Sequence, residues 1–524
     1  MAQETELKLE LHPDDLPRLL AHPLLAGQAP RRARLLNTYY DTAALALRAQ
    51  RLAVRERRVG RRTLLTVKTA GSSVGGLSRR GEWEAPSRPG RFDFASLVDD
   101  SALAEQLGRV AWQLVPVFRT DFTRRTWLLT HGAARVELAL DQGVIATGSA
   151  GDGHRLPILE LELELLEGPV GDLLDLAHTL ALGPQGRSEQ GLRLLPADRS
   201  KAERGYALFM GERLQPVKAQ PLQLQAGMHP VQALRAAAFA CLAHLQANAA
   251  GLRQPPLEGG LPDPEFVHQA RVALRRLRTG LRLFAPYLPG RFVGYWSAQW
   301  REVAGQLGEA RDWDVFAGEW LPGLLAELAP EAGLQAEASA LGEWVASQRR
   351  EAGLRALQTL SGSAHALRLL AFMHAVWRLP PADPVGGTAP TRDSVLVSWA
   401  GDALRERHAR LRREARTARR QGPEGRHQLR IELKKLRYAQ EFLGGLLPAG
   451  RMARSTALLA QAQELLGGLN DLSTAQGLLA RVPASLSGEV VARLQDGLQA
   501  RLDFGLRSLP AMERALERAA LPKG

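Results

Sequence analysis

Stretches that alternate polar and apolar residues run through the first 205 residues. Examples are TELKLEL, RLAVRERR, TLLTVKT, ARVELALD and PILELELELL. Successive side chains of a β-strand point to opposite faces, so each stretch predicts a strand with one polar and one apolar face. Because glycine- and proline-containing turns separate these strands, the first half predicts an antiparallel barrel or curled sheet with a few helices.

The pattern becomes helical from about Val231, where apolar residues recur every three to four positions. A proline-containing stretch with neither rhythm precedes it and predicts a boundary. We therefore expect an α+β domain at 1–208, a linker at 209–228 and an all-α domain at 229–515. A second loop, PPADPVGGTAPTRD, divides the helical domain into blocks at about 229–380 and 390–515.

The two helical blocks repeat one another. HQARVALRRLR begins at His268 and HQLRIELKKLR begins at His427, an offset of 159 residues. LGEARDWD and LGGLNDLS match at the same offset, which places Asp312 and Asp471 in register. A gapless match of this length indicates an internal repeat, so we expect two superposable helical bundles.

The charge of the chain is concentrated in the helical half. The 524 residues carry a formal net charge of +13. Residues 1–210 contain 28 Lys+Arg and 26 Asp+Glu, and the remainder contains 40 and 29, which leaves +11 for the second half. A basic domain of this kind favours a polyanionic partner such as polyphosphate, nucleic acid or an anionic membrane. An arginine-rich proteome would give a similar composition without any such partner.

Other features of the sequence argue against some classes of protein. The single cysteine, Cys241, allows neither an internal disulfide nor a cysteine-based zinc site. The N-terminus lacks the apolar core of a secretory signal, and no run of about 18 uncharged apolar residues predicts a membrane span. We therefore expect a cytoplasmic protein with no membrane segment.

Charged residues of both signs occupy one face of nearly every predicted strand. Glu4, Glu6 and Lys8 share a face, as do Arg55 and Arg57. One such strand alone is typical of a solvent-exposed surface. A closed sheet with many charged inward faces would be unstable unless the charges neutralised each other or a ligand. Arg and Lys bind phosphate oxygens, and carboxylates bind Mg²⁺ or Mn²⁺, so a metal-bound triphosphate suits both sets.

These residues resemble a known family. Glu4-x-Glu6-x-Lys8 resembles the ExExK signature of CYTH domains, which belong to the triphosphate tunnel metalloenzyme superfamily. The resemblance continues, in order, through TYYDT, RLAVRER, LTVKT, GEWEAP, FRTDFTRR, ELALD, LELELEL and SKAERGY. It implies an eight-stranded antiparallel β tunnel that binds a triphosphate. The chain has no GxxxxGK[ST] phosphate loop, which argues against a P-loop mechanism.

The resemblance assigns roles by position. It implies that Mg²⁺ or Mn²⁺ is held by Glu4, Glu6, Glu160 and Glu162. It implies that the triphosphate contacts Lys8, Arg55, Arg57, Lys68, Arg119, Arg125 and Lys201. The implied catalytic residues are Glu4, Glu6, Lys8 and Asp141. Two choices stay open: only one of Arg124 and Arg125 can point inward, and Glu164 shares the face of Glu160 and Glu162.

The helical repeats carry a basic stripe. At about 100° per residue, His268, Arg271, Arg275 and Arg278 lie on one helical face. The second copy repeats this stripe in His427, Arg430, Lys434 and Arg437, and Arg276 and Lys435 lie to one side of it. Like charges on one helical face destabilise a helix, which favours a polyanion as partner. Asp312 and Asp471 have two open roles, pairing with one of these arginines or capping a helix. The HxxR spacing is not that of a paired metal site.

The two copies resemble the CHAD domain. The resemblance implies an all-α domain of two pseudo-symmetric four-helix bundles that binds inorganic polyphosphate. The implied polyphosphate-binding residues are His268, Arg271, Arg275, Arg276, Arg278, His427, Arg430, Lys434, Lys435 and Arg437.

Together the two halves resemble a CYTH–CHAD inorganic triphosphatase. The implied reaction is the metal-dependent hydrolysis of tripolyphosphate to pyrophosphate and phosphate, with polyphosphate granules as a further location. Thiamine triphosphate, a nucleoside triphosphate or the cyclisation of ATP are alternative reactions, because fold does not fix chemistry. A non-catalytic polyphosphate-binding protein is a third hypothesis. No recognition-helix, zinc-finger or aromatic stacking motif favours specific nucleic-acid binding.

Overall fold

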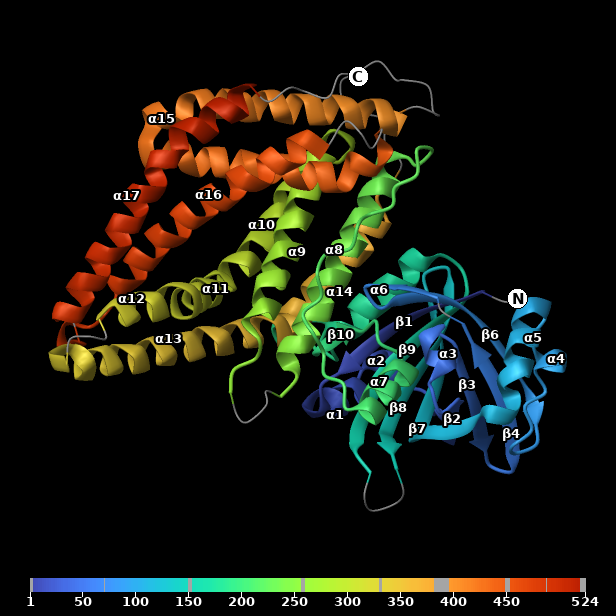
Figure 1. Cartoon of the computed structure of the whole chain (residues 1–524). Coiled ribbons are helices and arrows are strands. Elements are labelled where there is room, and N and C mark those ends of the chain that lie inside the picture. The colour runs from blue at the N-terminus through green and yellow to red at the C-terminus, as the bar shows by residue number, and fades with distance from the viewer. Residues whose placement is uncertain are drawn as a thin grey trace. The chain divides into compact units, whose positions relative to one another are not determined.

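The computed structural model describes residues 3–69, 71–148, 153–255, 260–328, 332–380, 395–447, 453–486 and 488–518. The chain forms two compact units (Figure 1). The first comprises Met1–Gln215 and Leu360–Arg378, and the second comprises Pro216–Thr359 and Leu379–Gly524. None of the described helices combines the length and the apolar composition needed to cross a lipid bilayer.

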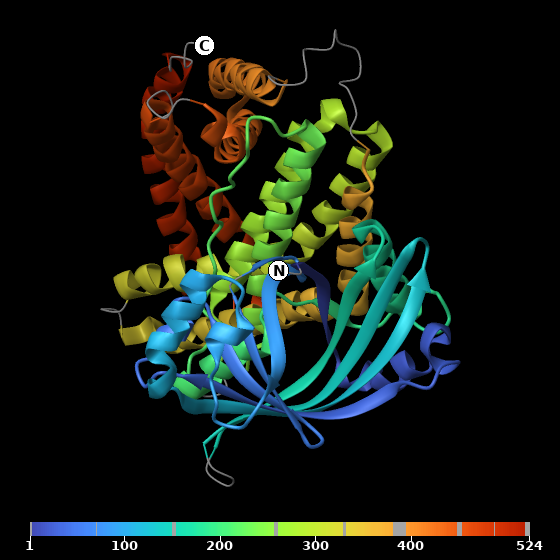
Figure 2. The same cartoon turned by 90° about the vertical axis from the view of Figure 1, so that its right-hand side faces the viewer.

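Eight antiparallel strands form a closed ring in the first unit. The hydrogen-bonded order is β1-β9-β8-β7-β2-β3-β4-β6, and β6 pairs back with β1, with Glu6 opposite Ser78. The ring strands are β1 (Gln3–Leu11), β2 (Arg31–Asp41), β3 (Ala53–Val59), β4 (Arg62–Lys68), β6 (Leu77–Ser87), β7 (Val115–His131), β8 (Ala134–Thr147) and β9 (Arg155–Glu167). Two short strands, β5 (Ser72–Val74) and β10 (Leu194–Pro196), pair with β6 and β1. The predicted eight-stranded antiparallel tunnel is confirmed, and Figure 2 shows the strands curling around a common interior.

Much of the apolar core of the first unit lies between the strands and the helices that cover them. Val54 and Val67, on β3 and β4, pack with Phe94 and Leu107. Alternation therefore leaves the other face of these strands polar and directed into the ring. The helices of this region are α1 (Leu16–Leu20), α2 (Pro23–Ala26), α3 (Ala46–Ala49), α4 (Phe94–Leu97), α5 (Ser101–Val110), α6 (Val170–Ala181) and α7 (Lys201–Met210).

One further helix, α14 (Ser363–Trp377), belongs to the first unit although the sequence places it in the helical half. It packs against α6 and β10. Most of its surface is apolar, and a helix that is apolar nearly all round is buried rather than left at a surface. Asp175 of α6 lies 3.3 Å from Nδ1 of His374 and 2.8 Å from Nε2 of His131.

The second unit is all-helical, as predicted, and its elements follow the sequence repeat. Adding 159 residues converts α8 and α9 approximately into the two halves of α15, the α10–α12 region into α16, and α13 into α17. The helices are α8 (Pro230–Arg253), α9 (Pro264–Leu283), α10 (Gly290–Gln306), α11 (Gly308–Val315), α12 (Leu321–Leu328), α13 (Gln335–Ser361), α15 (Val395–Leu443), α16 (Ala453–Leu479) and α17 (Glu489–Arg518).

The two copies differ in where their helices break. α15 contains Gly422 with φ 62° and ψ −136°, followed by Pro423, so its two halves are separate helices joined by a kink. The first copy is interrupted at Leu307 and continues through a π-helical turn at Phe316–Trp320, whereas α16 runs through the corresponding positions.

Candidate functional site

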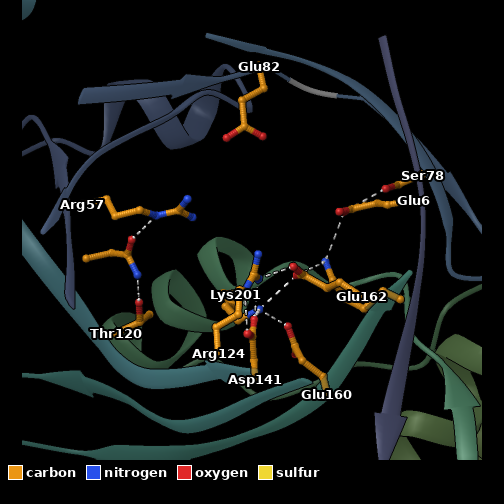
Figure 3. Close-up of polar contacts among 12 residues, drawn as sticks. Glu6, Arg57, Ser78, Glu82, Thr120, Arg124, Asp141, Glu160, Glu162 and Lys201 are labelled. Atoms are coloured by element: carbon orange, nitrogen blue, oxygen red, sulfur yellow. Dashed lines mark hydrogen bonds and ion pairs between the residues drawn. The ribbon is translucent and has the colours of Figure 1, made fainter. Parts of the chain in front are cut away.

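The interior of the strand ring holds a cavity of about 810 Å³. Side chains from all eight ring strands and from the start of α7 line it. Figure 3 shows Glu82, Arg57, Glu6 and Glu162 approaching this space from different strands. The cavity therefore brings together acidic and basic residues that lie far apart in the sequence.

Three carboxylates on β8 and β9 form the most heavily bonded part of the site. Oxygens of Asp141, Glu160 and Glu162 lie within 4.8 Å of one another. Nζ of Lys201 lies 2.6 Å from Asp141 and 3.0 Å from Glu162, and it also bonds Glu160. Arg124 donates to both oxygens of Asp141, at 2.7 and 2.6 Å, and to Glu162. The three negative charges are thus neutralised by buried cations.

The start of α7 is held by local contacts that fix Lys201. Ser200 and Glu203 form a capping box at the helix N-terminus. One turn later, Gly205 lies against the Phe118 ring, where an added Cβ would come within 2.1 Å of a ring carbon. Tyr206 then donates its hydroxyl to Asp41 at 2.9 Å. The SKAERGY segment therefore packs so closely that the Lys201 ammonium has a fixed position.

The cluster has a strong electrostatic preference for its charged state. Although burial opposes ionisation, Lys201, Arg124 and Lys8 hold the pKa of Glu162 well below its usual range. Burial likewise disfavours the Lys201 ammonium, but the three carboxylates raise its pKa above the ordinary lysine value. Removing one member would leave an uncompensated buried charge.

A second row of carboxylates is less fully neutralised, although Glu6 lies 3.8 Å from Nζ of Lys8. Glu6, Glu164 and Glu137 lie on adjacent strands β1, β9 and β8, where Glu164 is the register partner of both others. Among the residues that the structure describes, Glu164 and Glu137 form no ion pair with a lysine or arginine. Burial, followed by repulsion from Glu137, Glu6 and Glu82, raises the pKa of Glu164. This row carries the negative charge most in need of a cation.

The β3–β4 side of the cavity supplies guanidinium and ammonium groups. Arg55 lies 3.3 Å from Glu82, and Arg57 lies 3.4 Å from Glu84 and donates Nε to Asn37 at 3.0 Å. Lys68 also pairs with Glu82. Burial, together with the nearby Arg55 charge, lowers the pKa of Arg57 to about 10. This side therefore retains positive potential that a phosphate group could neutralise.

The structure corrects two of the predicted site residues and leaves one outside its description. Arg119 and Arg125 share the outward face of β7, and neither lines the cavity, so the prediction that they point inward is wrong. The inward face carries Thr120, Phe122 and Arg124. The Glu4 side chain lies outside the described residues, although its backbone pairs with β6. The cavity lining includes Glu6, Lys8, Arg55, Arg57, Lys68, Glu162 and Lys201.

Sequence reasoning also missed functional neighbours. Arg204 bonds Glu160, which is 1% exposed. It lies three residues after Lys201 on the same helix, a spacing that could have indicated a shared face. Ser78, which donates to Glu6 at 3.1 Å, carried no comparable signal.

The donor sets fit a divalent metal ion. Carboxylate oxygens are the ligands that Mg²⁺ and Mn²⁺ prefer, and both sets described above supply them from neighbouring strands. The Asp141–Glu160–Glu162 cluster is already matched by three cations. The Glu6–Glu164–Glu137 row is less neutralised, as the raised pKa of Glu164 indicates. The row therefore offers less neutralised oxygen ligands, whereas the Asp141–Glu160–Glu162 cluster offers oxygens that already lie within 4.8 Å of one another.

A second pocket, of about 220 Å³, lies in the helical unit. It collects side chains of both repeats, with Arg271 and Arg275 from α9, Arg430 and Lys434 from α15, and Arg311 from α11. His268, Asp312 and Asp471 also line it. Both aspartates lie inside helices, so the alternative role as N-caps is excluded.

The cations of this pocket outnumber their acidic partners. Burial and repulsion from Arg275 and Arg430 lower the pKa of Lys434 to about 6, against a smaller opposing effect of Asp471. Burial lowers the pKa of Arg271 and of Arg430 as well, with further repulsion from Arg275. The pocket consequently has the excess positive potential expected of an anion site.

Five of the ten residues predicted for the basic face do not line this pocket. Arg276 is 2% exposed, lies 3.3 Å from Glu441 and stacks over Phe442, because its helical phase directs it into the core. Lys435 pairs with the buried Glu432 on its own helix. The others are Arg278, His427 and Arg437. Arg278 lies about one helical turn beyond Arg275, and Arg437 about one turn beyond Lys434. His427 is exposed shortly after the Gly422 kink.

Comparison with known proteins supports the division of the chain into two domains. A family model described as the CYTH domain matches residues 2–191, and one described as the CHAD domain matches residues 236–480. A curated protein from Haemophilus influenzae named "Inorganic triphosphatase" is 35% identical over 211 residues, which are 40% of this chain. The match spans about half of that relative's length, 55%.

Two solved structures are also similar. The crystal structure of the CHAD domain from the plant Ricinus communis is 27% identical, with a TM-score of 0.49, over 59% of this chain and 99% of that one. PptA from Streptomyces chartreusis is 19% identical, with a TM-score of 0.41, over 57% and 100%. Since both TM-scores are below 0.5, the assignment depends on the family models, which agree with the closed strand ring and the helical repeat. The chain therefore contains a CYTH domain at residues 2–191 followed by a CHAD domain at residues 236–480.

Proposed function

We propose that the CYTH cavity is the active site of a metal-dependent inorganic triphosphatase that converts tripolyphosphate into pyrophosphate and phosphate. The observation that carries this proposal is the meeting of carboxylates and cations from opposite strands in one cavity. A chain of phosphates complexed with a divalent cation needs both signs of charge at once. The curated relative is named for the same activity.

The acidic and the basic side chains of the cavity have different roles in the proposed reaction. Glu6, Glu164 and Glu137 would hold Mg²⁺ or Mn²⁺, with Glu162 and Glu4 as further ligands. When bound, the metal would neutralise charge on the phosphoryl oxygens and lower the pKa of a water molecule. Arg55 and Arg57 present planar forks suited to phosphate oxygens, and Lys8, Lys68, Arg124 and Lys201 add point charges or further forks. Glu160 and Asp141, which are buried and bonded by Lys201, position these cations.

A substrate and metal panel tests the proposal. Tripolyphosphate, pyrophosphate, thiamine triphosphate and ATP are each incubated with Mg²⁺, Mn²⁺ or EDTA, and products are identified by ion chromatography. We expect equal amounts of pyrophosphate and phosphate from tripolyphosphate, only with metal. Faster turnover of another triphosphate, or cyclic AMP from ATP, would favour the corresponding alternative. No turnover of any compound would leave a binding protein.

We propose further that the pocket of the CHAD domain binds inorganic polyphosphate. Its six basic side chains converge from three helices around a space that also contains two aspartates. Arg271 donates Nη1 to the carbonyl of Ala304 at 2.9 Å, so its guanidinium is already oriented. A pre-oriented cation loses less side-chain entropy when a phosphate binds.

Reversing two of these charges should abolish tight polyphosphate binding. The double variant Arg271→Glu with Arg430→Glu replaces two attractions by repulsions, so we expect affinity for long-chain polyphosphate to fall by at least about 100-fold. The dependence of affinity on salt should weaken too. Filter binding measures both quantities. The exposed pair Arg350→Glu with Arg507→Glu has the same net charge and should retain most of the affinity. Equal losses of affinity in the two double variants would mean that the overall charge of the domain, and not this pocket, binds the polyanion.

Binding in this pocket should strengthen as pH falls. Lys434 has a pKa of about 6 in the free protein, so it is mostly neutral at pH 8. A bound polyanion favours the ammonium form, and binding therefore takes up a proton and is tighter at lower pH. We expect about 10-fold higher affinity at pH 6 than at pH 8. In Lys434→Arg, which stays charged throughout, most of this difference should disappear; an unchanged difference would assign the effect to another group.

A further inference from the structure

Three arginines that the triphosphatase proposal does not use line one end of the CYTH cavity. They are Arg48, Arg51 and Arg199. Arg48 and Arg51 lie in the connection between the end of β2 and the start of β3, and Arg199 lies two residues before α7. All three belong to the first unit.

This end of the cavity lies away from the row formed by Glu6, Glu164 and Glu137, the acidic row, along the strands. Arg48 and Arg51 follow the C-terminal end of β2, where Asp41 pairs with Val115 at the start of β7. Glu137 of the acidic row lies towards the opposite end of the ring, opposite Leu128 near the end of β7. The three arginines therefore gather at one mouth of the cavity, together with Glu203 and Glu212, and the acidic row lies towards the other end.

The turn that carries two of these arginines is fixed by a buried carboxylate. Asp41 is fully buried and accepts backbone N–H groups of Thr42, Leu47 and Arg48 at 2.7, 2.8 and 2.9 Å. Its remaining bond, from the Tyr206 hydroxyl, ties the turn to α7. The short helix α3 is thereby held at the mouth without help from a ligand.

Arg51 has two features that its surroundings do not explain. Its φ is +55°, a left-handed conformation that costs a non-glycine residue roughly 1 kcal/mol or more. Within the part of the chain that the structure describes, its guanidinium has no ion-pair or hydrogen-bond partner. Arg48, by contrast, bonds Glu212 at 2.6 Å, and Arg199 lies near Glu203. The backbone thus holds a cation at the mouth with no acidic partner among the described residues.

From this arrangement we infer that Arg48, Arg51 and Arg199 form an outer phosphate subsite, through which the cavity accepts linear polyphosphates longer than tripolyphosphate. The inference rests on the triphosphatase function proposed above. A volume of about 810 Å³ lies within the range of roughly 300–1,000 Å³ that holds drug-sized ligands, which leaves room beyond three phosphates. Phosphate would displace Glu212 from Arg48.

The acidic row at one end and the three arginines at the other set the direction of the chain. The end phosphate lies beside the acidic row with its metal, and the fourth phosphate reaches the outer subsite. Water oxygen bonds to the terminal phosphorus, the bond from that phosphorus to the bridging oxygen breaks, and the bridging oxygen leaves on the shortened chain. One phosphate and a chain one unit shorter are formed, and the protons of the water pass to the products and solvent.

Steady-state kinetics of the full-length protein with tripolyphosphate and with linear tetrapolyphosphate test this inference. In the double variant Arg51→Gln with Arg199→Gln, we expect kcat/KM for tetrapolyphosphate to fall about 10-fold, mainly through KM, because two charged hydrogen bonds are lost. For tripolyphosphate the change should stay within about 2-fold. The matched control is Arg119→Gln, which removes an exposed arginine from the outside of the same ring and should alter neither substrate.

The outcomes separate this inference from the proposed function. If the wild type cleaves tripolyphosphate but not tetrapolyphosphate, or if the double variant loses both substrates equally, the outer subsite is wrong and the triphosphatase remains. If the wild type cleaves neither, both are wrong. A selective loss of tetrapolyphosphate in the double variant, with an unchanged control, supports the outer subsite.

Discussion

Glu6→Gln is expected to reduce kcat/KM for tripolyphosphate by about 1,000-fold with Mg²⁺ or Mn²⁺, because a bound metal contributes several kcal/mol to stabilising the transition state. The amide keeps the size of the side chain and can still accept the hydrogen bond from Ser78. It removes the negative charge that the acidic row needs to attract a cation. Phosphate release at a metal concentration that just saturates the wild type measures the effect.

A matched control separates this loss from general damage to the fold. Glu105 is exposed on α5 and pairs with Arg109 at 3.1 Å, so Glu105→Gln should retain wild-type activity and thermal stability. Higher metal concentration should restore part of the activity of Glu6→Gln if a weakened metal site is the cause. A Glu6→Gln rate within about 3-fold of wild type at every metal concentration would exclude Glu6 as a ligand.

Lys201→Met should have the largest effect on stability. Lys201 is 6% exposed, and its ammonium group bonds three carboxylates that are themselves largely buried. Removing it leaves buried negative charge that Arg124, Arg204 and Lys8 offset only in part, so we expect the CYTH domain to lose about 3–5 kcal/mol of unfolding free energy without metal. Urea unfolding in EDTA measures the loss.

Divalent metal should reverse part of that loss. The oxygens of Asp141, Glu160 and Glu162 lie within 4.8 Å of one another, so Mn²⁺ can occupy the space vacated by the ammonium group. We expect a larger stabilisation by Mn²⁺ in Lys201→Met than in the wild type. The exposed substitution Lys218→Met should change neither value. Equal stability of Lys201→Met and wild type in EDTA would show that the cluster does not depend on Lys201.

The alternation of polar and apolar residues was sufficient to predict which face of most strands lines the cavity. It correctly grouped Glu6 with Lys8, Arg55 with Arg57, and Glu160 with Glu162. It failed on β7. Assigning Arg119 to the inward face assigns every odd-numbered residue of the strand, including Arg125, to that face, whereas the even-numbered residues point inward. The inward face of β7 carries aromatic residues, and Phe118 packs against Tyr39 and Tyr206, so polarity alone gave the wrong face.

Helical phase predicted the basic stripe but not its extent. The phase correctly placed Arg271 and Arg275 on one face and Arg276 to one side. The pocket, however, is a local space where helices from two repeats approach, so residues one or two turns further along the same stripe lie outside it. Arg311 was missed because it comes from α11, and no pattern on α9 indicates which other helix packs there. The placement of α14 with the strand ring had no signal beyond its apolar surface.

A crystal structure of the full-length protein with Mn²⁺ and tripolyphosphate, with manganese located by its anomalous scattering, would test the proposed active site most directly. We expect manganese beside Glu6 and Glu164, and phosphate oxygens in contact with Arg55 and Arg57. Manganese or tripolyphosphate bound only outside the strand ring would show that the opposed charges of the cavity serve each other and not a substrate.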